Sequence, residues 1–150
     1  MSHFLAAMSR EESDALVDRI EWSFDEHRFG LWAVEVRDTA DFIGFTGLAR
    51  QTFEAHFTPA VEVGWRLAAH AWGHGYATEA ASASLDFAFG DLGLDEVVSM
   101  TATSNTRSIA VMERLGMFRD PDDDFDHPRV PEGHPLRPHV LYRIATGDLA

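Results

Sequence analysis

The hydrophobic residues of the chain recur with two different periods. Apolar positions three or four residues apart are typical of helices, and apolar positions that alternate with polar ones are typical of strands. The predicted helices cover residues 10–27, 76–89 and 105–115, and the predicted strands cover residues 31–36, 42–48, 59–67, 95–102 and 139–145. This order of elements predicts an α/β fold in which crossover helices flank a mixed sheet.

Cap and turn signals support these boundaries. Ser9 and Glu12 have the spacing of a capping box at the start of the first helix, and Gly116 has the place of a C′ residue after the last one. Residues 37–41 are typical of a hairpin turn between the first two strands. The aromatic residues of the strands and their connections are expected to fill the core: Phe42, Phe45, Phe57 and Trp65.

The composition indicates one domain. No linker rich in Pro, Gly or Ser divides the 150 residues, so a single domain over residues 1–150 is predicted. There is no cysteine, which excludes disulfides and thiolate zinc sites. No segment has the pattern of a signal peptide or a membrane span, so a cytoplasmic protein is expected.

The charge is strongly negative. The formal net charge is −13, and the chain contains arginine but no lysine. Such a charge repels nucleic-acid phosphates and anionic lipid, so neither a nucleic acid nor a membrane is expected as a partner. It either attracts amines and basic peptides or only keeps the protein soluble.

Two glycines stand in the segment AWGHGYATEA, where the second predicted helix begins. The first N–H groups of a helix have no partner within it and lie at the positive end of its dipole, so Gly73 and Gly75 mark a candidate anion site. The Walker pattern fails because no lysine follows, and the dinucleotide pattern fails because Thr78 stands where its third glycine would be. Two interpretations of the segment with Gly73 and Gly75 therefore stay open: a turn that binds phosphate, and a tight turn packed against the sheet.

A second segment, NTRSIAVMERLGM, opens the last predicted helix. Together with VEVGWRL and AWGHGYATEA, in this order and with similar separations, it resembles the GNAT superfamily of acyl-CoA-dependent N-acyltransferases. Within that superfamily it is similar to the ribosomal-protein-acetyltransferase-like (RimJ/RimL-like) branch. The resemblance implies a GNAT fold with a splayed central sheet flanked by helices, and acetyl-CoA as the acyl donor without a metal.

The resemblance also assigns the coenzyme contacts. The turn from His70 to Gly75 matches the family's pyrophosphate-binding loop, which uses backbone N–H groups, although His70 stands where Gln or Arg is usual. The strand edge near Trp65 and Leu67 matches the edge that pairs with the pantetheine arm, and Asn105 either caps its helix or bonds that arm. The implied contacts are Trp65, Leu67, His70, Trp72, Gly73, His74, Gly75, Tyr76, Ala77, Thr78 and Asn105.

Acyl transfer to an amine needs a base for the amine and a proton source for the departing thiolate. Many relatives use a tyrosine as the proton source, but the matching position here is Met112, and Ser108, one turn earlier, is the implied donor. If Ser108 is not the proton donor, it is either an ordinary serine on the helix surface or its hydroxyl bonds a backbone carbonyl of the preceding turn. Glu62, on the strand beside the expected thioester, is either the base or a partner for a neighbouring arginine. Glu79 is explained by the helix dipole alone.

The segment from Asp120 to Pro138, with the residue after it, contains PDDDFDH and three histidines, His127, His134 and His139. Its spacing fits neither a calcium loop nor a helical histidine pair, so no metal is expected there. A solvated loop near the substrate mouth is predicted instead.

Three functions stay open. The leading one is an acetyl-CoA-dependent N-acetyltransferase that acts on a primary amine, either a protein N-terminus or a small molecule, by direct attack on the thioester. The others are a non-catalytic acyl-CoA-binding or regulatory domain and a nucleotide-phosphate-binding module. Family members usually have a strand and a helix before the segment matched by residues 9–26, so a late start or a shortened domain is expected. A homodimer through residues 31–36 or 10–27 would then cover the exposed surface.

Overall fold

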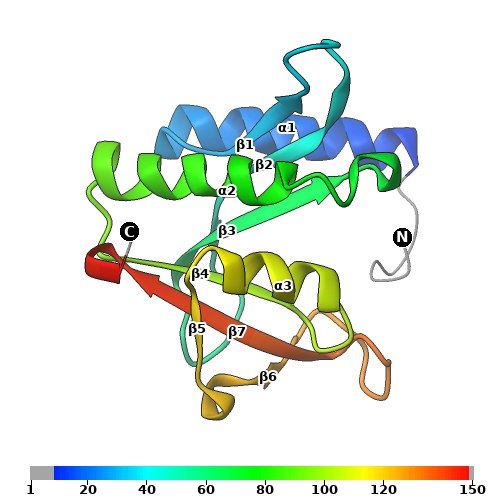
Figure 1. Ribbon diagram of the computed structural model, residues 1–150. Helices are drawn as coiled ribbons and strands as arrows, with labels where there is room; N and C mark the ends of the chain where they lie inside the picture. The colour runs from blue at the N-terminus through cyan, green and yellow to red at the C-terminus, as the bar shows by residue number, and fades with distance from the viewer. Residues whose placement is uncertain (1–8, 149–150) are drawn as a thin grey trace.

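The computed structural model describes residues 9–148, and the predicted helices and strands are present in it (Figure 1). The helices are α1 (Arg10–His27), α2 (Tyr76–Asp86) and α3 (Thr106–Arg114). The strands are β1 (Leu31–Glu35), β2 (Phe42–Gln51), β3 (Ala60–Leu67), β4 (Glu96–Ala102), β5 (Phe118–Arg119), β6 (Phe125–Asp126) and β7 (Pro138–Ala145). The sequence did not predict β5, β6 or the π-helical turn Phe87–Asp91, because such short elements leave no periodic signal.

The helix starts differ in how their free N–H groups are satisfied. At α1, Ser9 Oγ accepts from the Glu12 N–H at 3.1 Å and Glu12 Oε1 accepts from the Ser9 N–H at 3.2 Å, which confirms the capping box. At α3, the side chain of Asn105 accepts from the Ser108 N–H. At α2, Gly75 is the N-cap and has no side chain to accept a hydrogen bond. The first turn of α2 therefore keeps its N–H groups for another partner.

The strands form one mixed sheet in the order β1-β2-β3-β4-β7-β5, with β6 paired to β7. Every neighbouring pair is antiparallel except β3 and β4. The strands β2 and β3 pair along all of β3, whereas β3 and β4 share the single register pair Glu62↔Val98. The sheet is therefore splayed at its centre, as Figure 1 shows where β3 and β4 diverge.

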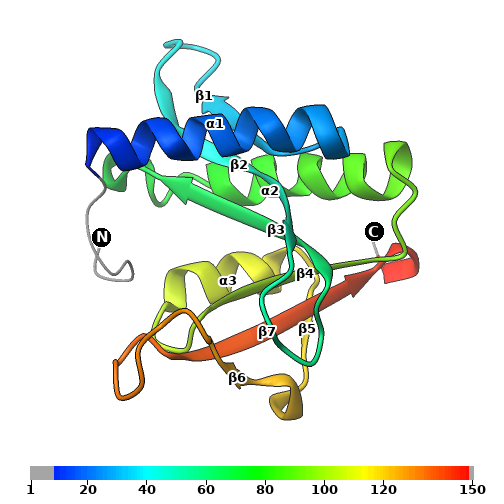
Figure 2. The same ribbon diagram turned by 180° about the vertical axis from the view of Figure 1, so that it is seen from behind.

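The helices cover both faces of this sheet. Figures 1 and 2 show α1 and α2 on opposite sides of the part formed by β1, β2 and β3, with α3 beside β4. Both halves of the splayed sheet contribute to one core, which includes Leu48, Val63, Leu85, Val97, Met112 and Ile144. No helix within residues 9–148 is long and apolar enough to cross a lipid bilayer.

The prediction that four aromatic residues fill the core is wrong for Phe42. Its neighbour Ile43 is buried, and because successive residues of a strand point to opposite faces, Phe42 points outward and is 65% exposed. Trp65 packs against the main core but is only half-buried. Phe57 packs in a second cluster, with Phe53 at 5.9 Å between ring centroids.

Candidate active site

The glycine turn has a backbone that glycine alone adopts easily. Gly73 has φ +83° and Gly75 has φ +79°, in the left-handed region. A Cβ built on either residue would have no other heavy atom within 4 Å, so the turn is open rather than packed against the sheet. The first hydrogen bond of α2 runs from the Glu79 N–H to Gly75 O, at 3.0 Å. The N–H groups before Glu79 therefore stand free at the positive end of the helix dipole.

This turn forms one end of a groove of about 1040 Å³ between β3, α2 and α3. The predicted coenzyme contacts that line it are Trp65, Leu67, Trp72, Gly73, Gly75, Tyr76, Ala77, Thr78 and Asn105. His70 and His74 are not among the lining residues; His70 is exposed, and the His74 ring stacks on Tyr76 at 5.2 Å. Most of the predicted contacts thus share one groove.

Three arginines, Arg66, Arg107 and Arg114, also line the groove, although the chain carries a net charge of −13. The Arg107 guanidinium lies 4.3 Å from the centre of the Trp72 ring, and the Trp72 indole donates to Leu67 O at 3.0 Å. Sequence reasoning missed these arginines. The spacing of Arg107 and Arg114, seven residues apart on one helix, was the signal that could have found two of them. Together with the free N–H groups, they suit a polyanionic ligand.

Ser108 stands at the inner end of the groove with a defined hydrogen-bond pattern. Its Oγ accepts from Trp65 Nε1 at 3.3 Å and from Asn105 Nδ2 at 3.2 Å. The Asn105 amide is fixed because its Oδ1 accepts from the Ser108 N–H and its Nδ2 also donates to Thr101 Oγ1 at 2.9 Å. Since a hydroxyl oxygen has two lone pairs, the Ser108 hydrogen is left to donate to a further group. Met112, the position at which the resemblance implied a tyrosine, is 1% exposed and has no O–H to donate.

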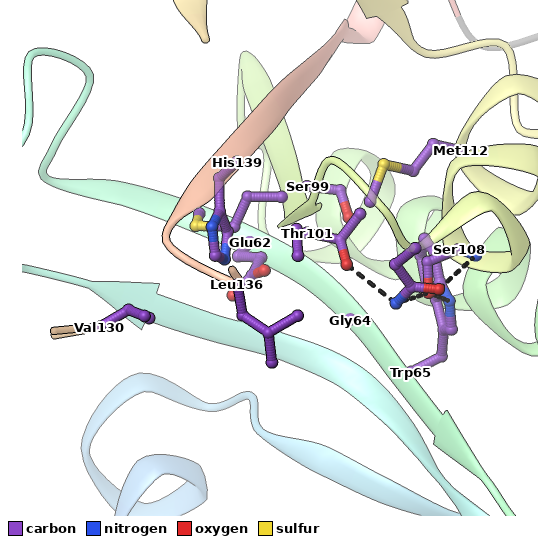
Figure 3. Close-up of a pocket in the computed structure, with 13 residues that line it drawn as sticks. Glu62, Gly64, Trp65, Ser99, Thr101, Ser108, Met112, Val130, Leu136 and His139 are labelled. Carbon is purple, nitrogen blue, oxygen red and sulfur yellow. Dashed lines mark hydrogen bonds between the residues drawn. The ribbon is translucent and has the colours of Figure 1, made fainter. Parts of the chain in front are cut away.

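A chamber of about 240 Å³ continues from this point (Figure 3). Its walls come from β3 (Glu62, Gly64, Trp65), β4 (Ser99, Met100, Thr101, Ala102), the start of α3 (Asn105, Ser108, Met112), the segment before β7 (Val130, Leu136) and β7 (His139). Trp65, Asn105 and Ser108 line both the chamber and the groove. The two spaces therefore meet at Ser108.

The chamber passes through the splay from one face of the sheet to the other. Trp65 and Thr101 bond the Ser108–Asn105 pair and so point toward α3. Glu62 is an odd number of residues from Trp65, so it points to the opposite face. Where the two strands part, Ser99 Oγ donates to Val63 O at 2.9 Å and bridges them. A ligand in the groove and a ligand in the chamber would therefore approach each other from opposite sides of the sheet.

Glu62 carries a carboxyl group suited to proton transfer near neutral pH. Burial raises its pKa to about 7, although the Gln51 amide and the Met100 N–H, which bond the carboxylate, lower it. Gln51 Nε2 donates to Glu62 Oε1 at 2.8 Å. The carboxyl thus has a neutral amide as a hydrogen-bond partner and exchanges its proton around pH 7.

The segment predicted as a solvated loop is in fact partly folded against the sheet. Phe125 and His127 pack against Phe53 and Phe57, with Phe53 and His127 at 4.5 Å between ring centroids. Burial lowers the pKa of His127 to about 4, with smaller contributions from neighbouring cations. Aromatic packing between two segments far apart in the sequence holds Phe125 and His127 against Phe53, although most residues of the loop are exposed as predicted.

His139 is the site residue that sequence reasoning failed to place. It lines the chamber, and its half-buried ring lies 5.0 Å from His127 and 5.5 Å from Phe125. Burial lowers the pKa of His139 as well. Within residues 9–148, no group of three or more His, Cys, Asp or Glu residues is placed to hold a metal ion.

Comparison with known proteins identifies the family. Residues 1–118 match the family described as the acetyltransferase (GNAT) domain. The chain belongs to the GNAT acetyltransferase family. Its splayed sheet and its groove at the N-terminus of α2 are the features that the resemblance implied.

Relatives and solved structures agree with this assignment. The chain is 36% identical, over 59% of its length and 39% of the relative's, to the FsC-acetyl coenzyme A-N(2)-transacetylase of Aspergillus fumigatus. An acetyltransferase from Agrobacterium tumefaciens has a TM-score of 0.72 and 26% identity, over 95% of this chain and 76% of that one.

A ribosomal-protein-S5-alanine acetyltransferase from Vibrio fischeri has a TM-score of 0.74 and 17% identity, over 96% of this chain and 79% of that one, which shows a common fold. The chain spans between 39% and 62% of the length of the curated relatives it matches. These matches establish the GNAT fold and family.

Proposed function

We propose that the protein transfers an acetyl group from acetyl-CoA to a primary amine by direct attack on the thioester. The observation that carries this proposal is the meeting of the groove and the chamber at Ser108, Trp65 and Asn105. A groove for the donor and a chamber for the acceptor must meet at one point for the acyl group to pass between them.

The groove suits acetyl-CoA in charge and in shape. The free N–H groups after Gly75 and the guanidinium of Arg107 are donors for phosphate oxygens. The groove then runs along β3, whose edge facing β4 has no register pair with β4 beyond Glu62, although Ser99 Oγ bonds Val63 O. An arm that contains amide groups can lie along such an edge with its thioester near Ser108.

Ser108 and Glu62 then have complementary roles. The free hydrogen of the Ser108 hydroxyl is directed to the leaving sulfur, because both lone pairs of its oxygen are occupied by Trp65 and Asn105. Glu62, with a pKa of about 7, accepts a proton from the incoming amine. A purely coenzyme-binding domain requires neither group, so their presence favours an enzyme over the non-catalytic alternative.

The acceptor is a primary amine on a small molecule or at a protein N-terminus. A chamber of about 240 Å³ suits a compact amine or the first residue of a peptide. Glu62 is the one carboxylate among its lining residues. A long polyamine would need several carboxylates, so a single amino group with a short apolar body fits better.

The experiment is a panel of amines tested for release of free thiol from acetyl-CoA. The panel contains compact monoamines, amino acids, short peptides with free N-termini, and polyamines. Amine-dependent thiol release confirms the acetyltransferase. Thermal stabilisation by acetyl-CoA without thiol release from any amine would favour a binding domain, and stabilisation by ATP or NAD instead of acetyl-CoA would favour a nucleotide module.

The homodimer expected from the sequence stays a prediction. No residue of α1 is buried, Trp22 is 58% exposed and Val17 48%, so α1 offers an apolar surface to a second copy. Light scattering at low micromolar concentration tests it. A monodisperse monomer that binds acetyl-CoA would contradict it.

A further inference from the structure

Glu62 and His139 lie on the same face of the sheet. In the register of β3 and β4, Glu62 stands opposite Val98, and in the register of β4 and β7, His139 stands opposite Ala102. Residues four apart on a strand point to the same face, so Val98 and Ala102 share a face and their partners share it with them. Both residues line the chamber, and Figure 3 shows them at its end away from Ser108.

Backbone groups of Arg137 and Pro138 hold the His139 ring. Its Nδ1 lies 3.0 Å from Arg137 O, and because a carbonyl can only accept, Nδ1 carries the hydrogen. The neutral ring therefore has its lone pair on Nε2. Phe125 and His127 hold the ring from its sides, at 5.5 and 5.0 Å between centroids. The chamber wall thus presents an oriented base.

The chemistry of the proposed reaction calls for a second base. A primary ammonium carries three N–H bonds and the amide product carries one, so two protons leave the nitrogen. A carboxylate such as Glu62 can take one of them. The second becomes acidic when the nitrogen bonds to the carbonyl carbon, because that nitrogen then bears a positive charge. A weaker base than Glu62 is sufficient for this second proton.

We propose that His139 Nε2 is this second base, an inference that rests on the proposed acetyltransferase function. Because Glu62 and His139 lie at the end of the chamber away from Ser108, each reaches the nitrogen through a water. Glu62 takes the first proton and frees the nitrogen lone pair, and the N–C bond to the thioester carbon forms. His139 Nε2 takes the second proton from the nitrogen of the tetrahedral intermediate, and the C–S bond breaks. The sulfur leaves as a thiolate that accepts the Ser108 hydrogen bond. Before the reaction the ammonium is positively charged and the Glu62 carboxylate is negatively charged. After it the His139 imidazolium carries the positive charge, the thiolate carries the negative charge, and Glu62 is neutral.

The groups around His139 determine the pH range in which it works. Glu62 lies on the same face across the splay, Asp126 on the neighbouring β6 favours the charged ring, and His127 packs against it. Arg137, whose carbonyl accepts from Nδ1, forms an ion pair with Asp126 at 3.9 Å. Burial is the largest influence and lowers the pKa of His139 below 6.5. The ring is therefore neutral, and able to accept a proton, at pH 7.

The test is the pH dependence of kcat/KM for the best amine of the panel, in the wild-type protein and in His139→Asn. Asparagine retains a donor for Arg137 O and removes Nε2. Two bases must be unprotonated in the wild type, so its acid limb should steepen to a slope of about two at low pH, against about one in the variant. At pH 7.5 we expect kcat to fall by about 10- to 100-fold with the KM for acetyl-CoA unchanged.

Two controls separate chemistry from structure. His134→Asn changes a histidine of the same segment that does not line the chamber, and it should retain the steep acid limb. His139→Ala should regain turnover when imidazole is added, in proportion to the neutral form of imidazole, which a loss of folding could not produce. Stabilisation by acetyl-CoA, measured at each pH, shows that every variant is folded.

The outcomes are distinct. A wild type that releases thiol with an amine, and a His139→Asn variant with the same kcat and the same acid limb, would overturn the role of His139 and leave the acetyltransferase proposal standing. Loss of turnover in His139→Asn with an unchanged acid limb and no rescue by imidazole would also overturn it, because His139 would then only support the wall. A wild type inactive with every amine would overturn the proposed function itself.

Discussion

The groove and the chamber share Trp65, Asn105 and Ser108, yet the rest of each is built from different parts of the chain. The groove presents backbone N–H groups of one local turn, held open by Gly73 and Gly75, with arginines along its length. The chamber presents side chains from β3, β4, β7 and the segment before β7. A substitution damages the groove when it alters backbone conformation or charge, whereas it damages the chamber when it alters the chemistry of one side chain.

The largest expected effect lies in the chamber. Glu62→Gln removes the proton acceptor and retains the shape of the side chain and a hydrogen bond to Gln51. We expect kcat to fall by about 10²- to 10⁴-fold while acetyl-CoA still stabilises the fold. Steady-state thiol release and a thermal shift assay measure the two effects. Glu54→Gln, an exposed glutamate outside the chamber, is the matched control, and an equal loss in both variants would contradict the assignment.

The next-largest loss of turnover is expected at Ser108, where the groove and the chamber meet. Ser108→Ala removes the hydrogen directed to the leaving sulfur, so kcat should fall by roughly 10- to 1,000-fold with little change in the affinity for acetyl-CoA. Ser82→Ala is the matched control, because Ser82 lines the groove but not the chamber. Unchanged turnover in Ser108→Ala would mean that another group, or water, assists the departure of sulfur.

A variant of the groove should lose binding of acetyl-CoA, whereas the two variants above should lose turnover and retain binding. Acetyl-CoA at about 100 times its dissociation constant should stabilise the wild type by about 2.7 kcal/mol, which is a rise in Tm of roughly 5 to 10 °C. Gly75→Glu blocks the anion site and should abolish this rise. Gly93→Glu introduces a side chain at a similar positive φ, +64°, outside the groove, and should retain it. Equal rises in wild type and Gly75→Glu would exclude the glycine turn as the phosphate site.

The smallest effect is on stability. Because burial raises the pKa of Glu62 to about 7 from an ordinary 4.5, the folded state holds more protons than the unfolded state between these values. The free energy of unfolding contributed by Glu62 therefore falls as pH rises through this window. The free energy of unfolding of Glu62→Gln, relative to that of the wild type, should therefore be about 1 to 3 kcal/mol larger at pH 8 than at pH 4. This is less than the full pKa difference would give, because the Glu62 residue is partly exposed. Urea titrations at both pH values measure it, and a pH-independent difference would contradict the raised pKa.

The glycine turn of the groove was predictable because its information is local. Gly73 and Gly75 stand two residues apart before a helical pattern, and both adopt the left-handed backbone that such a position suggests. Asn105 and Ser108 likewise lie within one turn of the same helix. Family resemblance added the roles that spacing alone left open.

The chamber was only partly predictable because its residues meet through the sheet. Glu62 was identified as a candidate base on β3, but its partner Gln51 comes from β2, and His139 comes from β7. Which of these share a face depends on strand register and on the splay, and neither follows from periodicity. The packing of Phe53 on His127 is equally non-local.

The central claim is that the donor binds in the groove and the amine binds in the chamber. Initial rates of thiol release, measured over both substrates for Arg107→Gln and Gly64→Val, test it most directly. Gly64 lines the chamber alone, and a Cβ there would meet no heavy atom within 4 Å, so valine should fill space without disturbing β3.

We expect Arg107→Gln to raise the KM for acetyl-CoA by about 10- to 100-fold with the KM for the amine unchanged. Gly64→Val should raise the KM for the amine by roughly tenfold or more with the KM for acetyl-CoA unchanged. If Gly64→Val raised the KM for acetyl-CoA as much as that for the amine, or if Arg107→Gln affected only the amine, the division into donor groove and acceptor chamber would be wrong.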